Sequence, residues 1–123
     1  MSTTQEPAFD WSQAASLLGE NPNEVDGEMS AIVRELVEGA DVQFQELKSK
    51  NGETDRKAIS SLSHGLRGCL LNFGFTEVGT ILMQIEKSTY SAGEYQDRVD
   101  QAMAVFVASK KLLATRYPSL GIT

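Results

Sequence analysis

The stretch from Ser61 to Gly74 holds the only histidine of the chain, His64, and a nearby cation, Arg67. An α-helix turns by about 100° per residue, so this stretch places its apolar side chains on one stripe about 100° wide. The stripe consists of Ile59, Leu62, Leu66, Cys69, Leu70 and Phe73. His64 lies roughly 170° from the centre of that stripe. We therefore expect its imidazole to face solvent, with Arg67 one turn later on the same side.

A solvent-facing imidazole near neutral pH has one ring nitrogen with a free lone pair and can act as a nucleophile. A cation one turn away can hold an incoming phosphoryl group. Gly65 and Gly68 each cost a helix roughly 1 kcal/mol relative to Ala, and they leave the imidazole open on one side. An isolated surface histidine is usually only a solvated side chain, but this combination favours phosphoryl acceptance.

The elements that must position this stretch are helical throughout. Asp10 followed by Gln13 predicts a capping box and a short helix that ends at Gly19. Apolar residues at three-and-four spacing predict four longer helices, over about 25–50, 54–72, 76–89 and 91–117. The predicted fold class is all-α, an antiparallel up-down four-helix bundle with a short additional N-terminal helix. Residues 1–8 are expected to form a flexible tail and residues 9–123 a single domain.

Local signals refine the helix ends and the core. Thr54 is the expected N-cap of the histidine helix, Gly74 suits a left-handed residue after it, and Ser91 with Glu94 predicts a second capping box. Cys69 is interpreted as a small buried side chain at the edge of the core. Further residues expected to face inward are Val78, Ile81, Leu82, Met83, Ile85, Tyr95, Val99, Met103, Phe106, Val107, Leu113 and Tyr117.

The composition excludes several classes of protein. The chain of 123 residues carries a net charge of −6 and no basic cluster, which argues against a nucleic-acid surface. It contains no apolar run of about 20 residues, and residues 1–6 lack a signal pattern, so we expect a cytoplasmic protein without membrane insertion. One cysteine and one histidine cannot form a disulfide or a tetrahedral zinc site, so no metal site is expected. Met1 and the length favour a free-standing protein, and a monomer is the expected state.

The stretch His64-Gly65-Leu66-Arg67-Gly68-Cys69-Leu70-Leu71-Asn72-Phe73-Gly74 resembles the signature of histidine-containing phosphotransfer (HPt) domains of multistep two-component signalling. That signature reads roughly H-x-L-K-G-(S/A)-x-x-x-(aliphatic or aromatic)-G. Arg67 stands where the family usually has lysine, and Cys69 stands where it usually has serine or alanine. The pair Ile85-Glu86 is similar to the family's Leu-Glu in the following helix, and the similarity spans about Phe9 to Tyr117.

The resemblance implies a phosphorelay intermediate. Nε2 of His64 would accept a phosphoryl group from a phosphoaspartate of a receiver domain and pass it to another receiver aspartate. Arg67 would steady the phosphoryl oxygens, and Glu86 would accept a hydrogen bond from Nδ1–H, the alternative being a solvated glutamate. The protein would be a phosphocarrier and not an enzyme, with no intrinsic cofactor and with Mg²⁺ supplied by the receiver. Its partners would be response-regulator receiver domains and a hybrid sensor histidine kinase.

A receiver would dock on a small apolar surface formed by Gly65, Gly68, Leu71 and Phe75, with Ala58 or Ala14 beside it. Ser60, Ser61 and Ser63 would be solvated or would bond the phosphohistidine, and the solvated reading is the simpler one.

Two other functions stay open. The first is an interaction adaptor of the same fold that binds receiver or kinase domains without phosphotransfer. The second is a haem or small-molecule bundle with His64 as ligand, which is disfavoured because the histidine points away from the interior where bundles hold cofactors.

Overall fold

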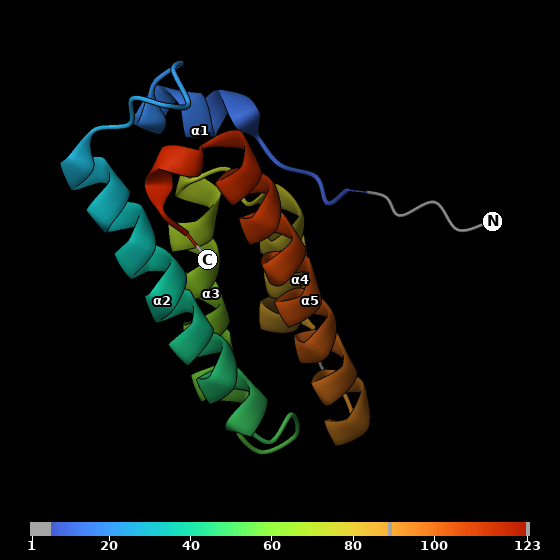
Figure 1. Ribbon diagram of the computed structural model, residues 1–123. Coiled ribbons are helices and arrows are strands. Elements are labelled where there is room, and N and C mark those ends of the chain that lie inside the picture. Colours follow the sequence, from blue (N-terminus) through green and yellow to red (C-terminus); the bar gives the residue numbers. More distant parts are fainter. Residues whose placement is uncertain (1–5, 89, 123) are drawn as a thin grey trace.

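The computed structural model describes residues 6–88 and 90–122, and every regular element in these ranges is helical (Figure 1). The elements are α1 (Trp11–Leu18), α2 (Gly27–Ser49), α3 (Arg56–Asn72), α4 (Thr76–Lys87), α5 (Ala92–Arg116) and the short 3₁₀-helix η1 (Pro118–Leu120). The predicted all-α class is therefore confirmed. Of the predicted flexible tail, residues 1–5 lie outside the described part of the chain.

The four longer helices run lengthwise beside one another (Figure 1). Each packs against the next in a closed order, α2 with α3, α3 with α4, α4 with α5 and α5 with α2. The most extensive packing is between α3 and α4. Helix α1 lies across the end at which α2 begins, and η1 packs against α2 and α5 at that end (Figure 1). The histidine-bearing helix thus has α4 as its main neighbour.

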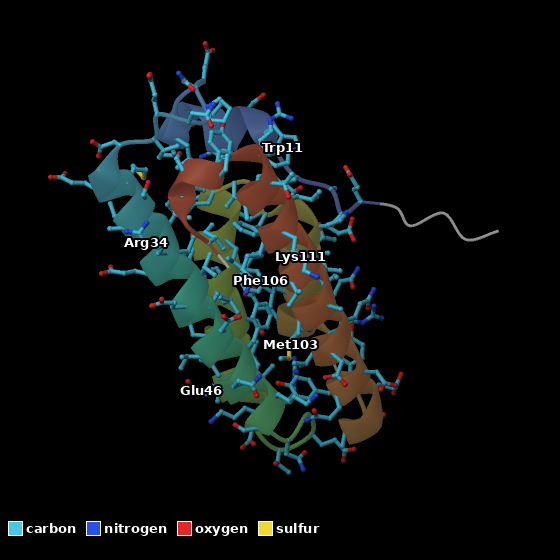
Figure 2. The ribbon with its side chains drawn as sticks, viewed as in Figure 1. Trp11, Arg34, Glu46, Met103, Phe106 and Lys111 are labelled. Atoms are coloured by element: carbon cyan, nitrogen blue, oxygen red, sulfur yellow. The ribbon has the colours of Figure 1, made fainter. Side chains whose placement is uncertain are left out.

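Aromatic rings fill the interior. The rings of Phe44 and Phe106 have centroids 5.3 Å apart, and those of Phe75 and Phe106 are 5.5 Å apart. Figure 2 shows Phe106 between α2 and α5, and Trp11 beside α1 at the end of the helices. The guanidinium carbon of Arg116 lies 4.9 Å from the centre of the Trp11 ring, a cation–π contact. The contact between Arg116 and Trp11 ties α1 to α5.

The start of α1 has only half of the predicted capping box. Asp10 Oδ1 accepts a hydrogen bond from the Gln13 amide at 3.1 Å. The Gln13 side chain does not complete the box, since its Nε2 donates to the Asn72 carbonyl at 2.9 Å. This bond instead joins α1 to the C-terminal end of α3. The second predicted capping box, between Ser91 and Glu94 at the start of α5, is present with both halves.

The core face of α3 differs from the predicted stripe. Its buried residues are Ile59, Ser63, Leu66 and Leu70, whereas Cys69 is exposed. The prediction of a buried Cys69 was wrong because the true stripe is centred nearer Ser63, and Cys69 falls about 90° from that centre. The small Ser63 side chain is fully buried at 0% exposure. With the stripe centred nearer Ser63, His64 lies on the side of α3 where it contacts Glu86 of α4.

The N-terminus of α3 also differs from its prediction. Asp55, and not Thr54, occupies the N-cap position. The Asp55 side chain makes no cap hydrogen bond to the helix, because its Oδ2 accepts from the Asn51 amide at 2.8 Å. Asp55 thereby closes the connection from α2, and the helix starts at Arg56.

Two residues at the edges of apolar stripes were assigned to the wrong side. Met83 and Val107 are 41% and 42% exposed, although both were expected to face inward. Each follows a buried neighbour, Leu82 and Phe106, and a step of about 100° carries the next side chain out of the core. The four remaining predictions for α4 are confirmed, since Val78, Ile81, Leu82 and Ile85 are all buried.

The turn between α3 and α4 requires glycine at position 74. Gly74 has a φ of +95°, and a Cβ at this position would lie 2.6 Å from the Asp10 carbonyl oxygen. We expect Gly74→Ala to lower the free energy of unfolding by about 2 kcal/mol or more, through backbone strain and this clash. Denaturant unfolding of the variant measures the loss.

Gly39→Ala is the matched control for Gly74→Ala. Gly39 lies inside α2 with nothing within 4 Å of an added Cβ. This change should leave stability unchanged or raise it by up to about 1 kcal/mol, because alanine is the better helix former. Equal stability of the two variants would contradict the account of the turn.

Candidate functional site

His64 lies in the middle of α3 and projects from the outer side of that helix. Its side chain is 67% exposed, as the helical wheel predicted. The fully buried residues Ile59, Ser63 and Leu66 anchor the opposite side of α3 in the core. The ring is therefore held on a fixed helix while its outer edge meets solvent.

Glu86 is the partner that α4 brings to the histidine. Its side chain is only 8% exposed, and Oε2 lies 3.0 Å from His64 Nδ1. The two residues belong to different helices, and the packing of α3 against α4 brings them together. The contact proposed from the sequence is present, and Glu86 is not a solvated glutamate.

Arg67 completes a three-residue cluster. Its Nη2 lies 3.2 Å from Glu86 Oε1, an ion pair, and 3.3 Å from His64 Nδ1. The Arg67 side chain is 20% exposed. The guanidinium thus sits on the Nδ1 side of the ring and is paired with Glu86.

The contacts at Nδ1 decide which ring nitrogen carries the proton. In a neutral imidazole Nδ1 either donates to Glu86 or accepts from Arg67, because it cannot do both. We assign the proton to Nδ1, since the carboxylate of Glu86 can only accept a hydrogen bond and its Oε2 is closer to Nδ1, at 3.0 Å, than Arg67 Nη2 is, at 3.3 Å. The lone pair is then on Nε2, the nitrogen that faces away from the cluster.

The charges around Glu86 keep it ionised. Burial alone would raise the pKa of its carboxyl, but the hydrogen bond from His64, the charge of the His64 ring when it is protonated and the charges of Lys87 and Arg67 lower the pKa below its ordinary value of 4.5. Lys87 Nζ lies 3.6 Å from Glu86 Oε2 and its side chain is 68% exposed. Lys87 was missed in the sequence analysis. Its only signal was its position next to Glu86.

The lowered pKa of Glu86 makes a prediction about acid stability. A carboxyl with a depressed folded-state pKa stabilises the fold above its ordinary pKa, and this contribution is lost as the pH falls through the folded-state value. The wild type should therefore lose stability relative to Glu86→Gln as the pH drops from about 5 to about 3. Denaturant unfolding at a series of pH values measures this, and a pH-independent difference would contradict the assignment.

The surface beside His64 on α3 is bare. A Cβ built at Gly65 or Gly68 would have nothing within 4 Å, so neither glycine is required by packing. Leu71 is 39% exposed, as expected. Its methyl carbon would lie 2.6 Å from a Cβ at Gly79, so Gly79 gives Leu71 room against α4. Gly65, Gly68 and Leu71 thus form an open strip along α3, which we call the α3 strip.

Phe75 does not belong to the α3 strip, and its assignment to the docking surface was wrong. It is 0% exposed, and its ring centroid lies 5.0 Å from that of Phe9. The helical wheel does not apply to it, because α3 ends at Asn72 and the turn at Gly74 redirects the chain into the core. Ala14 is likewise buried at 0%, whereas Ala58 is exposed.

The three serines before His64 do not behave alike. Ser61 is exposed and Ser60 is half-buried, while Ser63 is fully buried. The solvated reading is therefore wrong for Ser63, whose place in the core stripe follows from its spacing to Ile59 and Leu66.

The described ranges, 6–88 and 90–122, contain no group of three or more histidine, cysteine, aspartate or glutamate side chains that could hold a metal ion. None of their helices is long and apolar enough to cross a membrane.

Comparison with known proteins gives no further guide. No family model, curated protein or solved structure is found to match this chain.

Proposed function

We propose that this protein is a phosphorelay intermediate of the HPt type, which carries a phosphoryl group on Nε2 of His64. The proposed architecture is the antiparallel up-down four-helix bundle of that family, α2 to α5, with α1 as the additional N-terminal helix. The observation that carries the proposal is the contact between His64 Nδ1 and Glu86 Oε2 at 3.0 Å. It gives an exposed imidazole a fixed tautomer with Nε2 as the free nucleophile.

In the proposed reaction the Nε2 lone pair attacks the phosphorus of a receiver phosphoaspartate. The N–P bond forms as the bond from phosphorus to the aspartyl oxygen breaks, and that electron pair leaves with the aspartate carboxylate. The proton stays on Nδ1, where Glu86 accepts it in a hydrogen bond and balances the positive charge that develops on the ring. Transfer to a second receiver aspartate is the reverse of this step.

Charge favours the transferred group at this place. Arg67 and Lys87 contribute two positive charges and Glu86 one negative charge, so the cluster around the ring is net positive. A phosphoryl group on Nε2 carries negative oxygens, which this field attracts. Arg67 is proposed to steady those oxygens, for which its guanidinium must turn from Glu86 toward Nε2.

The partners follow from the chemistry that the cluster lacks. Phosphoryl transfer between a receiver and His64 uses the Mg²⁺ and acidic residues of the receiver, and the chain is a phosphocarrier without kinase activity of its own. The partners are response-regulator receiver domains and a hybrid sensor histidine kinase in the cytoplasm. The α3 strip is the proposed docking surface, because its glycines let a receiver approach the imidazole closely.

Incubation with phosphorylated receiver domains tests the proposal. We expect label to move from receiver to protein, and the bond to be labile in acid and stable in base, as a phosphoramidate is and a phosphoserine is not. The assay should include receivers both with and without Mg²⁺. The absence of transfer from every receiver of the same organism would contradict the proposal.

One observation favours a second function, that of a receiver-binding adaptor without transfer. Arg67 is held on the Nδ1 side by Glu86, at 3.2 Å, and does not lie at the free nitrogen. If the guanidinium stays there, the phosphoryl oxygens lose their proposed cation. Receiver binding in a titration without any transfer of label would support the adaptor and exclude the carrier.

A further inference from the structure

The end of α4 that presents Glu86 is held by a residue of the neighbouring helix. Arg56, the first residue of α3, donates from Nη2 to the carbonyl oxygens of Ser88 at 2.6 Å, Ile85 at 3.3 Å and Glu86 at 3.5 Å. Its side chain lies partly buried against these carbonyls. A single guanidinium nitrogen is thus within hydrogen-bond distance of two carbonyls in the last turn of α4 and of the carbonyl of its C-cap residue, Ser88.

The last turn of a helix needs such a partner. The last four carbonyl oxygens of an α-helix accept no hydrogen bond from an amide of the same helix. Arginine and lysine side chains can donate hydrogen bonds to them. In α4 the Gln84 carbonyl accepts from the Ser88 amide at 2.9 Å, while the Ile85 and Glu86 carbonyls turn to Arg56. The positive charge of Arg56 also lies at the negative end of the α4 dipole. Ile85 anchors the last turn of α4 in the core, and Arg56 adds hydrogen bonds to the carbonyls at the end of this turn.

The same turn sets the position of the Glu86 carboxylate. Glu86 reaches His64 only if its backbone keeps its helical position against α3, and the last turn of α4 also carries Lys87. Arg56 and His64 are on one rigid helix, so the bond from Arg56 to α4 fixes Glu86 relative to the imidazole. Displacements of about 1 Å are enough to break a charge-assisted hydrogen bond of this kind.

We infer that Arg56 is a positioning residue of the His64 site, which acts through Glu86 to hold the proton on Nδ1. It touches neither the imidazole nor the group transferred to it. The inference rests on the proposed function for its kinetic consequence only, because the tautomer of His64 can be measured without any phosphoryl transfer.

Nitrogen-15 NMR of the ring tests the inference directly. His64 is the only histidine, so the imidazole signals have a single source. We expect the wild type to hold the proton on Nδ1, and we expect Arg56→Ala to lower the Nδ1–H share to that of Glu86→Gln. Arg56→Lys should restore it in part, since lysine keeps the charge but offers a point donor where the guanidinium offers a planar fork. Lys57→Ala, which removes the adjacent charge from α3, is the matched control and should leave the tautomer unchanged.

A double variant separates positioning from general damage to the fold. In the Glu86→Gln background, Arg56→Ala should change the tautomer no further, because the residue through which it acts is already altered. An equal change in both backgrounds would overturn the inference, as would a wild-type tautomer in Arg56→Ala. If Arg56→Ala does not fold, Arg56→Gln replaces it, since it keeps the length and one donor. A wild-type tautomer in Arg56→Gln would then overturn the inference.

The transfer assay supplies the second measurement. Arg56→Ala should slow acceptance from a phosphorylated receiver by roughly tenfold, the scale on which small misplacements near a reacting group act. If the wild type accepts no phosphoryl group, the proposed function fails and the tautomer comparison still decides the role of Arg56. If the wild type accepts it and Arg56→Ala changes neither tautomer nor rate, the inference fails alone.

Discussion

We expect His64→Gln to abolish the proposed uptake of acid-labile phosphoryl label from a phosphorylated receiver. Glutamine has a similar length and keeps an amide donor for Glu86, but its nitrogen has no nucleophilic lone pair. The chain has no second histidine, so no other imidazole can take the label in its place. We expect the loss to be complete within the detection limit, because the reaction then lacks its acceptor.

The fold should survive this change. His64 is 67% exposed, and surface substitutions usually change the free energy of unfolding by about 0.5 kcal/mol or less. Circular dichroism and denaturant unfolding check that the variant is folded, and Lys57→Ala serves as a surface control on the same helix that should transfer normally. Label that persists on His64→Gln would place the acceptor elsewhere and contradict the site.

We expect Gly68→Gln to slow the proposed transfer by at least about tenfold while leaving the helices intact. Gly68 lies one turn after His64, on the α3 strip, and an added Cβ has nothing within 4 Å. The new side chain therefore causes no clash within the protein, and glutamine should raise stability by up to about 1 kcal/mol as a better helix former. A slower reaction in a protein of equal or greater stability would place the effect of Gly68→Gln at the site and not in the fold.

Gly39→Gln is the matched control, since Gly39 is also a helical glycine with open space around its Cβ position but lies on α2. Both variants should unfold at similar or higher denaturant concentration than the wild type. Single-turnover transfer rates at saturating and subsaturating receiver separate weaker docking from slower chemistry. Unchanged transfer in Gly68→Gln would mean that no partner passes over this part of α3.

The sequence was sufficient for features that depend on one helix at a time. The period of 3.6 residues predicted the exposed His64, the inward Val78, Ile81, Leu82 and Ile85 of α4, and the helical class. The Ser91 capping box and the left-handed Gly74 were also predicted, because each depends on a few adjacent residues.

The wrong predictions have physical reasons. Periodicity gives the direction of a side chain only within a helix, so it failed for Phe75, which follows the end of α3. Periodicity also gives the centre of an apolar stripe only approximately. For this reason Cys69 was expected to be buried but is exposed, and Ser63 was expected to be exposed but is buried. Residue type misled here, because the cysteine was taken for core and the serine for surface.

An exposed, solitary histidine on an amphipathic helix, with a cation and two glycines beside it, could be predicted from the amino-acid sequence. The contacts that hold this histidine in place depend on the packing between helices. The pairing of Arg67 with Glu86, the place of Lys87 and the bond from Arg56 to the end of α4 all depend on the rotation and height of α4 against α3. The helical period of a single helix does not determine the rotation or the height of α4 against α3, which are set by how the side chains of the two helices pack against each other.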